Sequence, residues 1–377
     1  MDATHFRAWS LPAIGAPLRI ERFPAPTPHP AGVLVRIESA MVLSYTAKVL
    51  DGSIAYATPP LPFTPGTNAI GVVRAVGAEV SHVAPGERVF LSPHLVADAP
   101  GDAPPQILIG LTAMGGSRFS GVADGSRRLQ EIWRDGVFAE LAHWPASCVT
   151  PLRGLDSIPS ERLIALAKLV VPYGGLLRAG VRPGQVVAIN GASGYYGSAG
   201  VMAALAMGAS KVVAIGRGRD ALAQLALALG PRVAPAALTG TDVEADVAAI
   251  QTAAGGGVDL ALDMLGQASS TATTLATLRS LRRGGRLVLM GSADAPLELS
   301  FGDMLGNDWE VVGNFMYPKT APASLATLAA SGLLDLAPIR LQRFAFSRLP
   351  AAIAAASAMR DLDLVAMEPG LADDESL

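Results

Sequence analysis

A glycine-rich turn near the middle of the chain has the residue pattern with the clearest chemical meaning. The sequence from 186 to 200 reads V-V-A-I-N-G-A-S-G-Y-Y-G-S-A-G, so glycines follow a short β-branched run. Glycine lets the backbone turn tightly and approach a pyrophosphate, whose charge the N–H groups at a helix N-terminus can meet. A predicted strand at 186–190 and a predicted alanine-rich helix over 196–207 flank the turn, which favours a dinucleotide site over an ordinary strand-to-helix turn. The predicted cofactor contacts are Gly191, Ala192, Ser193, Gly194, Tyr195, Tyr196 and Gly197.

The residues after the next predicted strand, 211–216, bear on which dinucleotide binds. A site for NAD usually presents an acidic side chain there to the ribose 2′-hydroxyl. In this chain Gly216 is followed by Arg217 and Arg219, and no carboxylate occurs before Asp220. A forked guanidinium suits a 2′-phosphate. We therefore predict that NADPH is the cofactor and that Gly216, Arg217 and Arg219 surround its phosphate. The alternative is that both arginines lie on a solvated loop.

The elements that must position this turn alternate between strands and helices. Short apolar runs are separated by helical segments, which is typical of a parallel sheet with right-handed crossovers. These predicted strands are 186–190, 211–216, 258–263, 286–291 and 309–312. Two amphipathic stretches within 322–358 surround a predicted strand at 340–346, and a last strand is expected at 363–367. The fold class that follows is α/β, with a doubly wound parallel sheet.

The first third of the chain has a different pattern, rich in short strands. Its alternating or β-branched runs are separated by glycine and proline turns. The predicted strands are 32–40, 70–76, 87–91 and 138–142. The segment 92–134 is less regular and contains several prolines and glycines, so we expect an insertion or a lobe over a cleft. A second, β-rich domain therefore accompanies the parallel sheet.

Length and composition limit the classes of function. A chain of 377 residues is long enough for two domains. Its formal net charge of −3 offers no basic excess, so we expect no nucleic-acid partner. Apolar stretches contain lysine and glycine and are shorter than the roughly 20 apolar residues that span a bilayer. Residues 1–20 show no apolar signal core. We expect a cytoplasmic protein that acts on a small molecule and not on a membrane.

The content of cysteine and histidine bears on metal binding. Cys148 is the only cysteine, which excludes an internal disulfide and a cysteine-rich metal site. The five histidines show no close pairing of the H-x-x-x-H kind. We therefore expect no metal site.

Several further motifs occur in a characteristic order around the glycine-rich turn. They are the segment 40–52, F-T-P-G-T-N-A-I-G-V-V-R-A-V-G at 63–77, P-G-E-R-V at 85–89, D-G-V-F-A-E at 135–140, L-R-R-G-G-R-L-V-L-M-G at 281–291 and V-V-G-N-F at 311–315. Over nearly the whole chain this series resembles the medium-chain dehydrogenase/reductase superfamily, specifically its zinc-free, quinone-oxidoreductase-like branch. The resemblance implies a GroES-like catalytic domain (1–168 with 315–377) and a Rossmann domain (169–314), with the active site between them. Further implied cofactor contacts are Gly291, Ser292, Asn314 and Phe315.

The departures from the zinc-bearing relatives concern the metal ligands. Anchoring on V-L-D-G at 49–52 puts Leu43 in the slot of the ligand cysteine. Where the family writes G-H-E, this chain has Gly66, Thr67 and Asn68, and the third ligand slot falls near Ala167. The cysteine-rich lobe that holds a structural zinc is missing. The resemblance therefore implies that neither zinc is bound.

Loss of zinc removes the Lewis acid that polarises a carbonyl oxygen, so the substrate must already be electrophilic. Quinones, enones and enoyl thioesters meet this condition, and a hydrogen bond can stabilise the enolate that forms. The anchoring places Tyr45 where zinc-bearing relatives keep a proton-relay hydroxyl. Tyr56 is a second candidate donor and Ser44 a third, while Asn68 is a candidate wall of the substrate pocket. The alternative for Tyr45 is an aromatic ring packed beneath the cofactor.

Three hypotheses of function follow. The leading one is an NADPH-dependent reductase of an activated alkene or quinone. The second is a metal-free carbonyl or alcohol dehydrogenase with Tyr45 as its acid and base. The third is an NADPH-binding protein without turnover. By family likeness we also expect a homodimer, in which the predicted edge strand 309–312 pairs with its twin.

Overall fold

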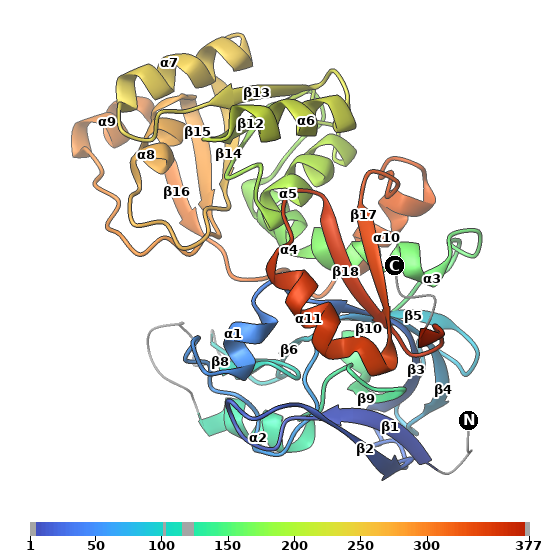
Figure 1. The fold of residues 1–377 in the computed structure, drawn as a ribbon. Helices are drawn as coiled ribbons and strands as arrows, with labels where there is room; N and C mark the ends of the chain where they lie inside the picture. Colours follow the sequence, from blue (N-terminus) through green and yellow to red (C-terminus); the bar gives the residue numbers. More distant parts are fainter. Residues whose placement is uncertain (1–4, 101–102, 115–123, 374–377) are drawn as a thin grey trace. The chain divides into compact units, whose positions relative to one another are not determined.

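The computed structural model describes residues 5–100, 103–114 and 124–373, and these residues form two compact units (Figure 1). The β-rich unit contains Met1–Ala167, Leu341–Met359 and Leu364–Leu377. The Rossmann unit contains Lys168–Arg340 and Arg360–Asp363. Each unit is therefore assembled from segments that are distant in the sequence.

The largest sheet of the β-rich unit is built on the long strand β3 (Gly32–Val42), which pairs antiparallel with β4, β9 and β18. The sheet order is β10-β5-β4-β3-β18-β17. The other members are β4 (Ala69–Val76), β5 (Arg88–Leu91), β9 (Leu141–Pro145), β10 (Val149–Pro151), β17 (Arg340–Ala345) and β18 (Asp363–Glu368). A separate hairpin joins β1 (His5–Ser10) to β2 (Arg19–Pro24). The predicted strands at 32–40, 70–76 and 87–91 are confirmed with small changes of boundary.

The strand predicted at 138–142 lies at 141–145 instead. The backbone N–H of Val137 donates to the Gly66 carbonyl oxygen and that of Phe138 donates to the Pro65 carbonyl oxygen. These residues therefore bond to the loop at 65–66 and not to a neighbouring strand. Ala139 keeps a single bridge to Ala8. The sequence pattern located the apolar run, but the strand begins only after these loop contacts end.

The segment 92–134, expected to be irregular, contains a small three-stranded sheet and a helix. The strands are β6 (His94–Val96), β7 (Gln106–Leu108) and β8 (Thr112–Met114), and the helix is α2 (Asp124–Ile132). Residues 101–102 and 115–123 of this segment lie outside the described residues. The remaining helices of the β-rich unit are short, namely α1 (Thr46–Leu50), α3 (Ser160–Leu163), α11 (Leu349–Ser357) and the 3₁₀ turns Ala146–Cys148 and Phe346–Arg348.

The Rossmann unit holds a parallel six-stranded sheet in the order β13-β12-β11-β14-β15-β16. The strands are β11 (Val186–Asn190), β12 (Lys211–Gly216), β13 (Val233–Ala237), β14 (Val258–Asp263), β15 (Leu281–Leu289) and β16 (Glu310–Gly313). The predicted doubly wound sheet is confirmed, and three strands have the predicted bounds. Strand β13 was not predicted, because V-A-P-A-A has weak β-propensity. Its proline is tolerated because β13 lies at the edge of the sheet.

Helices cover both faces of the sheet (Figure 1). Parallel crossovers are right-handed and the strand order reverses between β11 and β14, so α5 and α6 lie on one face and α7 and α8 on the other. The bounds are α4 (Ala165–Ala179), α5 (Tyr195–Ala206), α6 (Arg219–Leu229), α7 (Val243–Ala254), α8 (Ala272–Arg279), α9 (Phe301–Asn307) and α10 (Ala321–Ala330). Among the described residues, no helix combines the length and the apolar character that crossing a membrane requires.

The compact Rossmann unit continues to Arg340, beyond residue 314 where the sequence placed the end of the domain. The reason lies in close packing on α4. A Cβ atom at Gly174 would lie 2.5 Å from the carbonyl oxygen of Met316 and 2.5 Å from Cβ of Tyr317. Because glycine has no side chain there, the segment after β16 packs against α4 and stays with the Rossmann unit.

Candidate functional site

A pocket of about 350 Å³ opens at the carboxyl ends of the central strands of the Rossmann unit. It includes the point between β11 and β14 where the strand order reverses, which is where doubly wound sheets bind their ligands. We call it the glycine-turn pocket. Its lining residues are Asn190, Gly191, Ser193, Gly194, Gly216, Arg217, Gly240, Met264, Leu265, Gly266, Gln267, Ala268, Ser269, Ser270 and Thr273.

The glycines of the predicted turn have the geometry that a phosphate cradle needs. Gly191 has φ of +80°, which disfavours a side chain. A Cβ at Gly197 would lie 2.0 Å from the carbonyl oxygen of Gly191, so only glycine allows the helix to approach the turn this closely. Gly194 precedes α5 and provides no side chain to cap the first turn of the helix. The backbone at this helix start is thus suited to meet an anionic group.

Two polar side chains meet at the ends of β11 and β14, and one of them, Asn190, lines this pocket. Asn190 Nδ2 donates to a carboxylate oxygen of Asp263 at 2.9 Å and to Thr273 Oγ1 at 3.3 Å. Burial raises the pKa of the Asp263 carboxyl, and hydrogen bonds from Thr274, Leu265 and Asn190 act against that shift. Asn190 is 1% exposed, yet its Oδ1 has no hydrogen-bond partner among the described residues. A buried amide oxygen without a hydrogen-bond donor fits a bound ligand that donates a hydrogen bond to it.

The pocket wall at the end of β12 contains an arginine and no carboxylate. Arg217 lines the pocket, and its Cδ lies 3.5 Å from the position that a Cβ would occupy at Gly240. A Cβ at Gly216 would lie 3.3 Å from Ser193 Oγ, so glycine keeps this corner open. Arg219 begins α6 and is exposed, but it does not line the pocket. Of the two predicted arginines, the structure brings only Arg217 to the pocket.

Tyr195 and Tyr196 lie at the start of α5, and their rings meet at a centroid distance of 4.8 Å. Neither residue lines the glycine-turn pocket. The Tyr195 ring lies over the ammonium group of Lys168, with Nζ 4.1 Å from the ring centroid. Tyr195 therefore contacts α4 of its own unit, and the sequence did not indicate this role.

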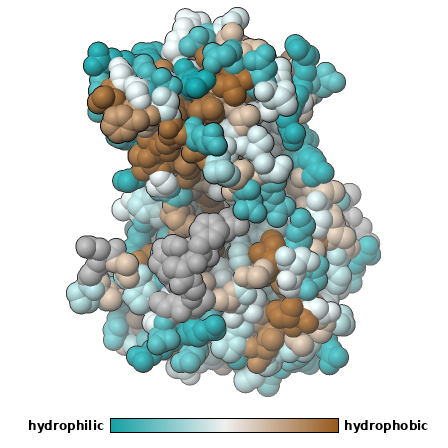
Figure 2. Space-filling model, turned by 90° about the vertical axis from the view of Figure 1, so that its left-hand side faces the viewer, coloured by the Kyte–Doolittle hydropathy of each residue, from teal (hydrophilic) through white to brown (hydrophobic). Residues whose placement is uncertain are grey.

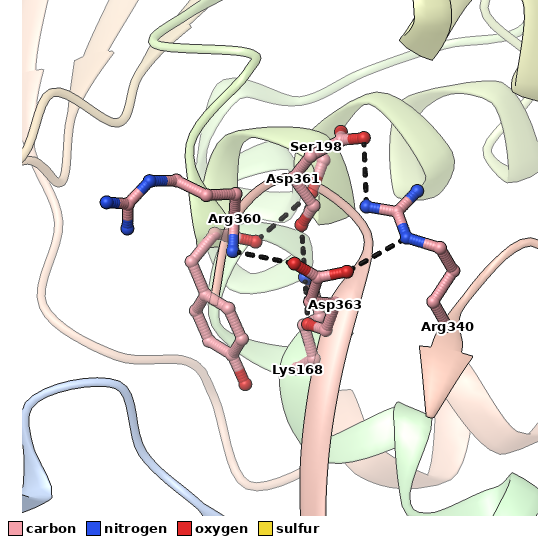
Figure 3. A network of polar contacts seen from close by, with 7 residues as sticks. Lys168, Ser198, Arg340, Arg360, Asp361 and Asp363 are labelled. Atoms are coloured by element: carbon pink, nitrogen blue, oxygen red, sulfur yellow. Dashed lines mark hydrogen bonds and ion pairs between the residues drawn. The ribbon is translucent and has the colours of Figure 1, made fainter. Parts of the chain in front are cut away.

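Lys168 is the centre of a polar network that fixes the returning segment 360–363 within the Rossmann unit (Figure 3). Its Nζ donates to the carbonyl oxygens of Asp361 and Asp363, at 2.5 and 2.9 Å. Ser198 Oγ donates to the same Asp361 oxygen at 2.6 Å, and Arg340 Nε donates to the Asp363 carboxylate at 2.9 Å. Burial lowers the pKa of Lys168 to about 7, although the charges of Asp361 and Asp363 act in the opposite direction. The network joins α4 and α5, which supports the helix that follows the glycine turn.

Five further predicted cofactor contacts of the Rossmann unit do not line the pocket, namely Ala192, Gly291, Ser292, Asn314 and Phe315. The N–H of Ser292 donates to Leu265 at 2.7 Å, and its Oγ accepts from the N–H of Gln267 at 3.0 Å. A Cβ at Gly291 would lie 2.3 Å from the carbonyl oxygen of Leu265. Gly291 and Ser292 thus shape the loop that lines the pocket. Asn314 Nδ2 donates to the Met316 carbonyl oxygen at 2.9 Å. Phe315 is 47% exposed, and Ala192 is fully buried.

The candidate proton donors lie together in the β-rich unit. Tyr45 is the N-cap residue of α1, and its ring meets that of Tyr56 edge-on at a centroid distance of 6.5 Å. Tyr45, Tyr56 and Ser44 are all half-buried. The structure therefore brings the three predicted hydroxyl groups to one region at the start of α1.

A narrow apolar pocket, with accessible space of only about 10 Å³, lies beside α1 in the same unit, and we call it the Thr67 pocket. Its lining residues are Met41, Leu43, Thr46, Val49, Leu50, Phe63, Pro65, Gly66, Thr67, Gly110, Leu111 and Phe138. Asn68, the predicted pocket residue, does not line it; its Nδ2 donates to the Leu91 carbonyl oxygen at 3.3 Å. The neighbouring Thr67 lines this pocket instead.

Two protein-family models match separate parts of the chain. The model described as "Alcohol dehydrogenase GroES-like domain" matches residues 29–154, and the one described as "Zinc-binding dehydrogenase" matches residues 197–331. The chain belongs to the medium-chain dehydrogenase/reductase superfamily. It is therefore an oxidoreductase with the GroES-like and Rossmann architecture of that superfamily.

Relatives of this superfamily member include enzymes of more than one kind. L-idonate 5-dehydrogenase of Vitis vinifera is 26% identical, over 88% of this chain and 86% of its own length. Quinone oxidoreductase-like protein 2 of Rattus norvegicus is 28% identical, over 78% of this chain and 69% of its own length. A solved Sinorhizobium meliloti 1021 structure, named as a zinc-binding dehydrogenase bound to NADP, has a TM-score of 0.75 at 21% identity, with coverage of 97% and 100%. The last likeness supports the fold.

The residues in the zinc-ligand slots of this superfamily member do not fit a zinc ion. Leu43, Thr67 and Ala167 are buried, with exposed fractions of 6%, 3% and 1%. Leucine and alanine have no donor atom for zinc, whose usual protein ligands are thiolate, imidazole and carboxylate. Within the described residues, no group of three or more His, Cys, Asp and Glu side chains could hold a metal ion.

Proposed function

We propose that this protein is a zinc-independent, NADPH-dependent reductase of activated alkenes or quinones. The observation that carries the proposal is the apolar wall formed by Leu43 and its neighbours beside Thr67, where zinc-bearing relatives place metal ligands. A substrate in such surroundings meets no Lewis acid from this chain, so it must be electrophilic by its own structure. Enones and quinones satisfy that requirement.

The residues of the glycine-turn pocket fit NADPH. Gly191, Gly194 and Gly197 form the cradle for the pyrophosphate, and Asn190 Oδ1 is a buried acceptor available for a donor of the ligand. Arg217 is placed at the end of β12 to meet a 2′-phosphate. When bound, NADPH supplies a hydride to the β-carbon of the activated alkene.

The chain's own residues then have two tasks. One is to stabilise the negative charge that develops on the substrate oxygen, which needs a positioned hydrogen-bond donor. The other is to deliver a proton to the α-carbon, and Tyr45 is the proposed donor because it begins the helix that lines the Thr67 pocket. The overall change is that one alkene is reduced to a saturated carbonyl while one NADPH is oxidised and one proton is taken up.

A direct assay distinguishes this function from the alternatives. Protein dialysed against a chelator is expected to oxidise NADPH with 2-cyclohexenone or a benzoquinone, and to leave cyclohexanone unreduced. Elemental analysis of the same sample is expected to show less than stoichiometric zinc. Reduction of cyclohexanone would favour the metal-free carbonyl dehydrogenase, which the alcohol and polyol dehydrogenases among the relatives suggest. One zinc per chain with chelator-sensitive activity would contradict the proposal.

We also propose that two copies of the chain pair through the edge strand β16. This strand ends the sheet order, and helix α9, which contacts the neighbouring strand β15, carries the exposed apolar side chains of Phe301 (84%) and Leu305 (69%). Figure 2 looks at the side of the Rossmann unit that carries α9 and β16 and shows apolar side chains gathered there. An edge strand paired with its twin about a two-fold axis satisfies its outer backbone groups and covers this patch.

The oligomeric state in solution tests the pairing. The protein is expected to sediment as a dimer, and Phe301→Glu is expected to sediment as a monomer at the same concentration, because the interface would bury an unpaired charge. Leu227→Glu is the matched control, since Leu227 is 79% exposed on α6, beside the opposite edge of the sheet. A dimer that survives Phe301→Glu, or dissociates equally in the control, contradicts this interface.

A further inference from the structure

We propose that Lys168 is a positioning residue for the cofactor: its buried ammonium group fixes the first turn of α5, the turn whose backbone meets the pyrophosphate of NADPH. This role rests on the proposed binding of NADPH and extends it to a side chain outside the glycine-turn pocket. It concerns the affinity for one part of the cofactor, and not the chemistry at the substrate.

The start of α5 presents backbone N–H groups that have no carbonyl oxygen of their own helix to bond to. Ser193 and Gly194 line the glycine-turn pocket and directly precede the helix. Gly194 is the N-cap residue and provides no side-chain hydrogen bond to the first turn. These N–H groups bind an anion only while the turn keeps its place, since the effect of a helix terminus falls off within one turn. The contacts that hold this turn therefore set the affinity for the pyrophosphate.

Two side chains of the first turn of α5 bind to the groups around Lys168. The Tyr195 ring lies over the ammonium group, with Nζ 4.1 Å from the ring centroid. Ser198 Oγ donates to the Asp361 carbonyl oxygen at 2.6 Å, and Lys168 Nζ donates to the same oxygen at 2.5 Å (Figure 3). The ammonium group thus holds the turn in two ways, directly through Tyr195 and through the oxygen that it shares with Ser198.

The segment 360–363, which accepts these bonds, is itself firmly held. Arg340 Nε donates to the Asp363 carboxylate at 2.9 Å, and the backbone N–H of Arg360 donates to that carboxylate at 3.0 Å (Figure 3). Asp361 has φ of +43°, a left-handed conformation that is uncommon for a residue with a side chain. Such a conformation persists where the surrounding bonds hold it. Lys168 therefore ties the helix to a fixed anchor, and not to a loop that could follow the helix.

The side chain of Lys168 lies in the interior of the Rossmann unit, and the residue is 0% exposed. A buried ammonium group is unfavourable unless hydrogen bonds and other charges compensate it. Here the carbonyl oxygens of Asp361 and Asp363 and the Tyr195 ring do so. A hydrocarbon side chain of the same length would avoid the cost of burying a charge, but it could bond to neither oxygen. The lysine is therefore explained by the connection that it makes between α4, α5 and the segment 360–363.

The test removes the ammonium group and compares two ligands. Lys168→Met is expected to raise the Kd of NADPH by about 5- to 30-fold, because the turn that meets the pyrophosphate is no longer held. Adenosine 2′-phosphate has no pyrophosphate, so its Kd is expected to stay within about twofold of that for the unmodified protein. Binding of NADPH is measured by its fluorescence, and binding of adenosine 2′-phosphate by its displacement of NADPH. A general loss of folded protein would weaken both ligands alike, so a difference between them reports on the turn.

Two further variants complete the test. Ser198→Ala removes the other bond to the Asp361 carbonyl oxygen and is expected to raise the Kd of NADPH by about 2- to 10-fold, with adenosine 2′-phosphate again unchanged. Lys211→Met is the matched control in the same unit, since Lys211 Nζ also donates to a carbonyl oxygen, that of Ala254 at 2.9 Å. Lys211 begins β12, at the end of the strand away from the pocket, so both Kd values are expected to stay within about twofold.

The outcomes separate the role of Lys168 from the function on which it rests. If the unmodified protein does not bind NADPH, the proposed function is wrong. If it binds NADPH and Lys168→Met weakens both ligands by the same factor, or weakens neither, Lys168 serves only the stability of the fold and the function stands. An equal loss of NADPH affinity in Lys211→Met also contradicts the role. Should Lys168→Met fail to fold, Ser198→Ala decides: a selective loss of NADPH affinity supports the role, and an unchanged Kd overturns it.

Discussion

Tyr45→Phe is expected to lower kcat for enone reduction by ~10²-fold or more, which is the scale of general acid catalysis. The substitution removes only the phenolic oxygen. The remaining ring can keep its edge-on contact with Tyr56 at 6.5 Å and its place at the start of α1. Binding of NADPH should not change, because Tyr45 does not line the glycine-turn pocket. The measurement is steady-state kinetics with saturating NADPH, together with a titration of the cofactor.

Tyr56→Phe is the matched control for this prediction. Tyr56 loses the same atom from a ring that shares the same contact, so a general effect of the deletion on packing would appear in both variants. If kcat is unchanged in Tyr45→Phe and falls in Tyr56→Phe, the two tyrosines exchange roles. If neither variant loses activity, Ser44→Ala becomes the test of the remaining hydroxyl, and Tyr45 is a packing residue.

The central parallel strands could be predicted from the sequence because burial on both faces makes each one rich in apolar residues. Strands β11, β12 and β14 have the predicted bounds for this reason. The turn at Gly191 followed from local geometry as well, since a positive φ and a close helix approach require glycine. Strand β13 could not be predicted, because its pairing with β12, and not its own composition, makes it a strand.

Features that depend on distant partners could not be predicted. In the sequence Lys168 is only a charge within an apolar run, and its partners are backbone oxygens of Asp361 and Asp363 that carry no sequence signal. Thr67 lines the pocket while Asn68 donates to the Leu91 carbonyl oxygen, and this difference depends on tertiary contacts that composition does not determine. Asn190 and Asp263 could have been found, because polar residues that end central parallel strands lie where ligands bind.

Arg217→Ala is expected to lower kcat/KM with NADPH by roughly 10- to 150-fold and to leave kcat/KM with NADH nearly constant. Arg217 lines the glycine-turn pocket after β12, where an NAD site would present a carboxylate. A guanidinium forms a charge-assisted pair with a phosphate, and a hydrogen bond to a charged group contributes ~1.5–3 kcal/mol. At ~1.4 kcal/mol per decade, that range gives the expected factor. NADH has no 2′-phosphate, so loss of the Arg217 guanidinium does not change kcat/KM with NADH.

Arg219→Ala is the control that the structure provides for this experiment. Arg219 begins α6 and is exposed outside the pocket, so its removal should change the NADPH preference much less than removal of Arg217. If Arg219 reaches the phosphate when the cofactor binds, the double variant will lose more of the preference than Arg217→Ala alone. The preference should also weaken with added salt, because an exposed ion pair is screened. Equal use of NADH and NADPH by the unmodified enzyme would refute the assignment of Arg217, whatever the substrate proves to be.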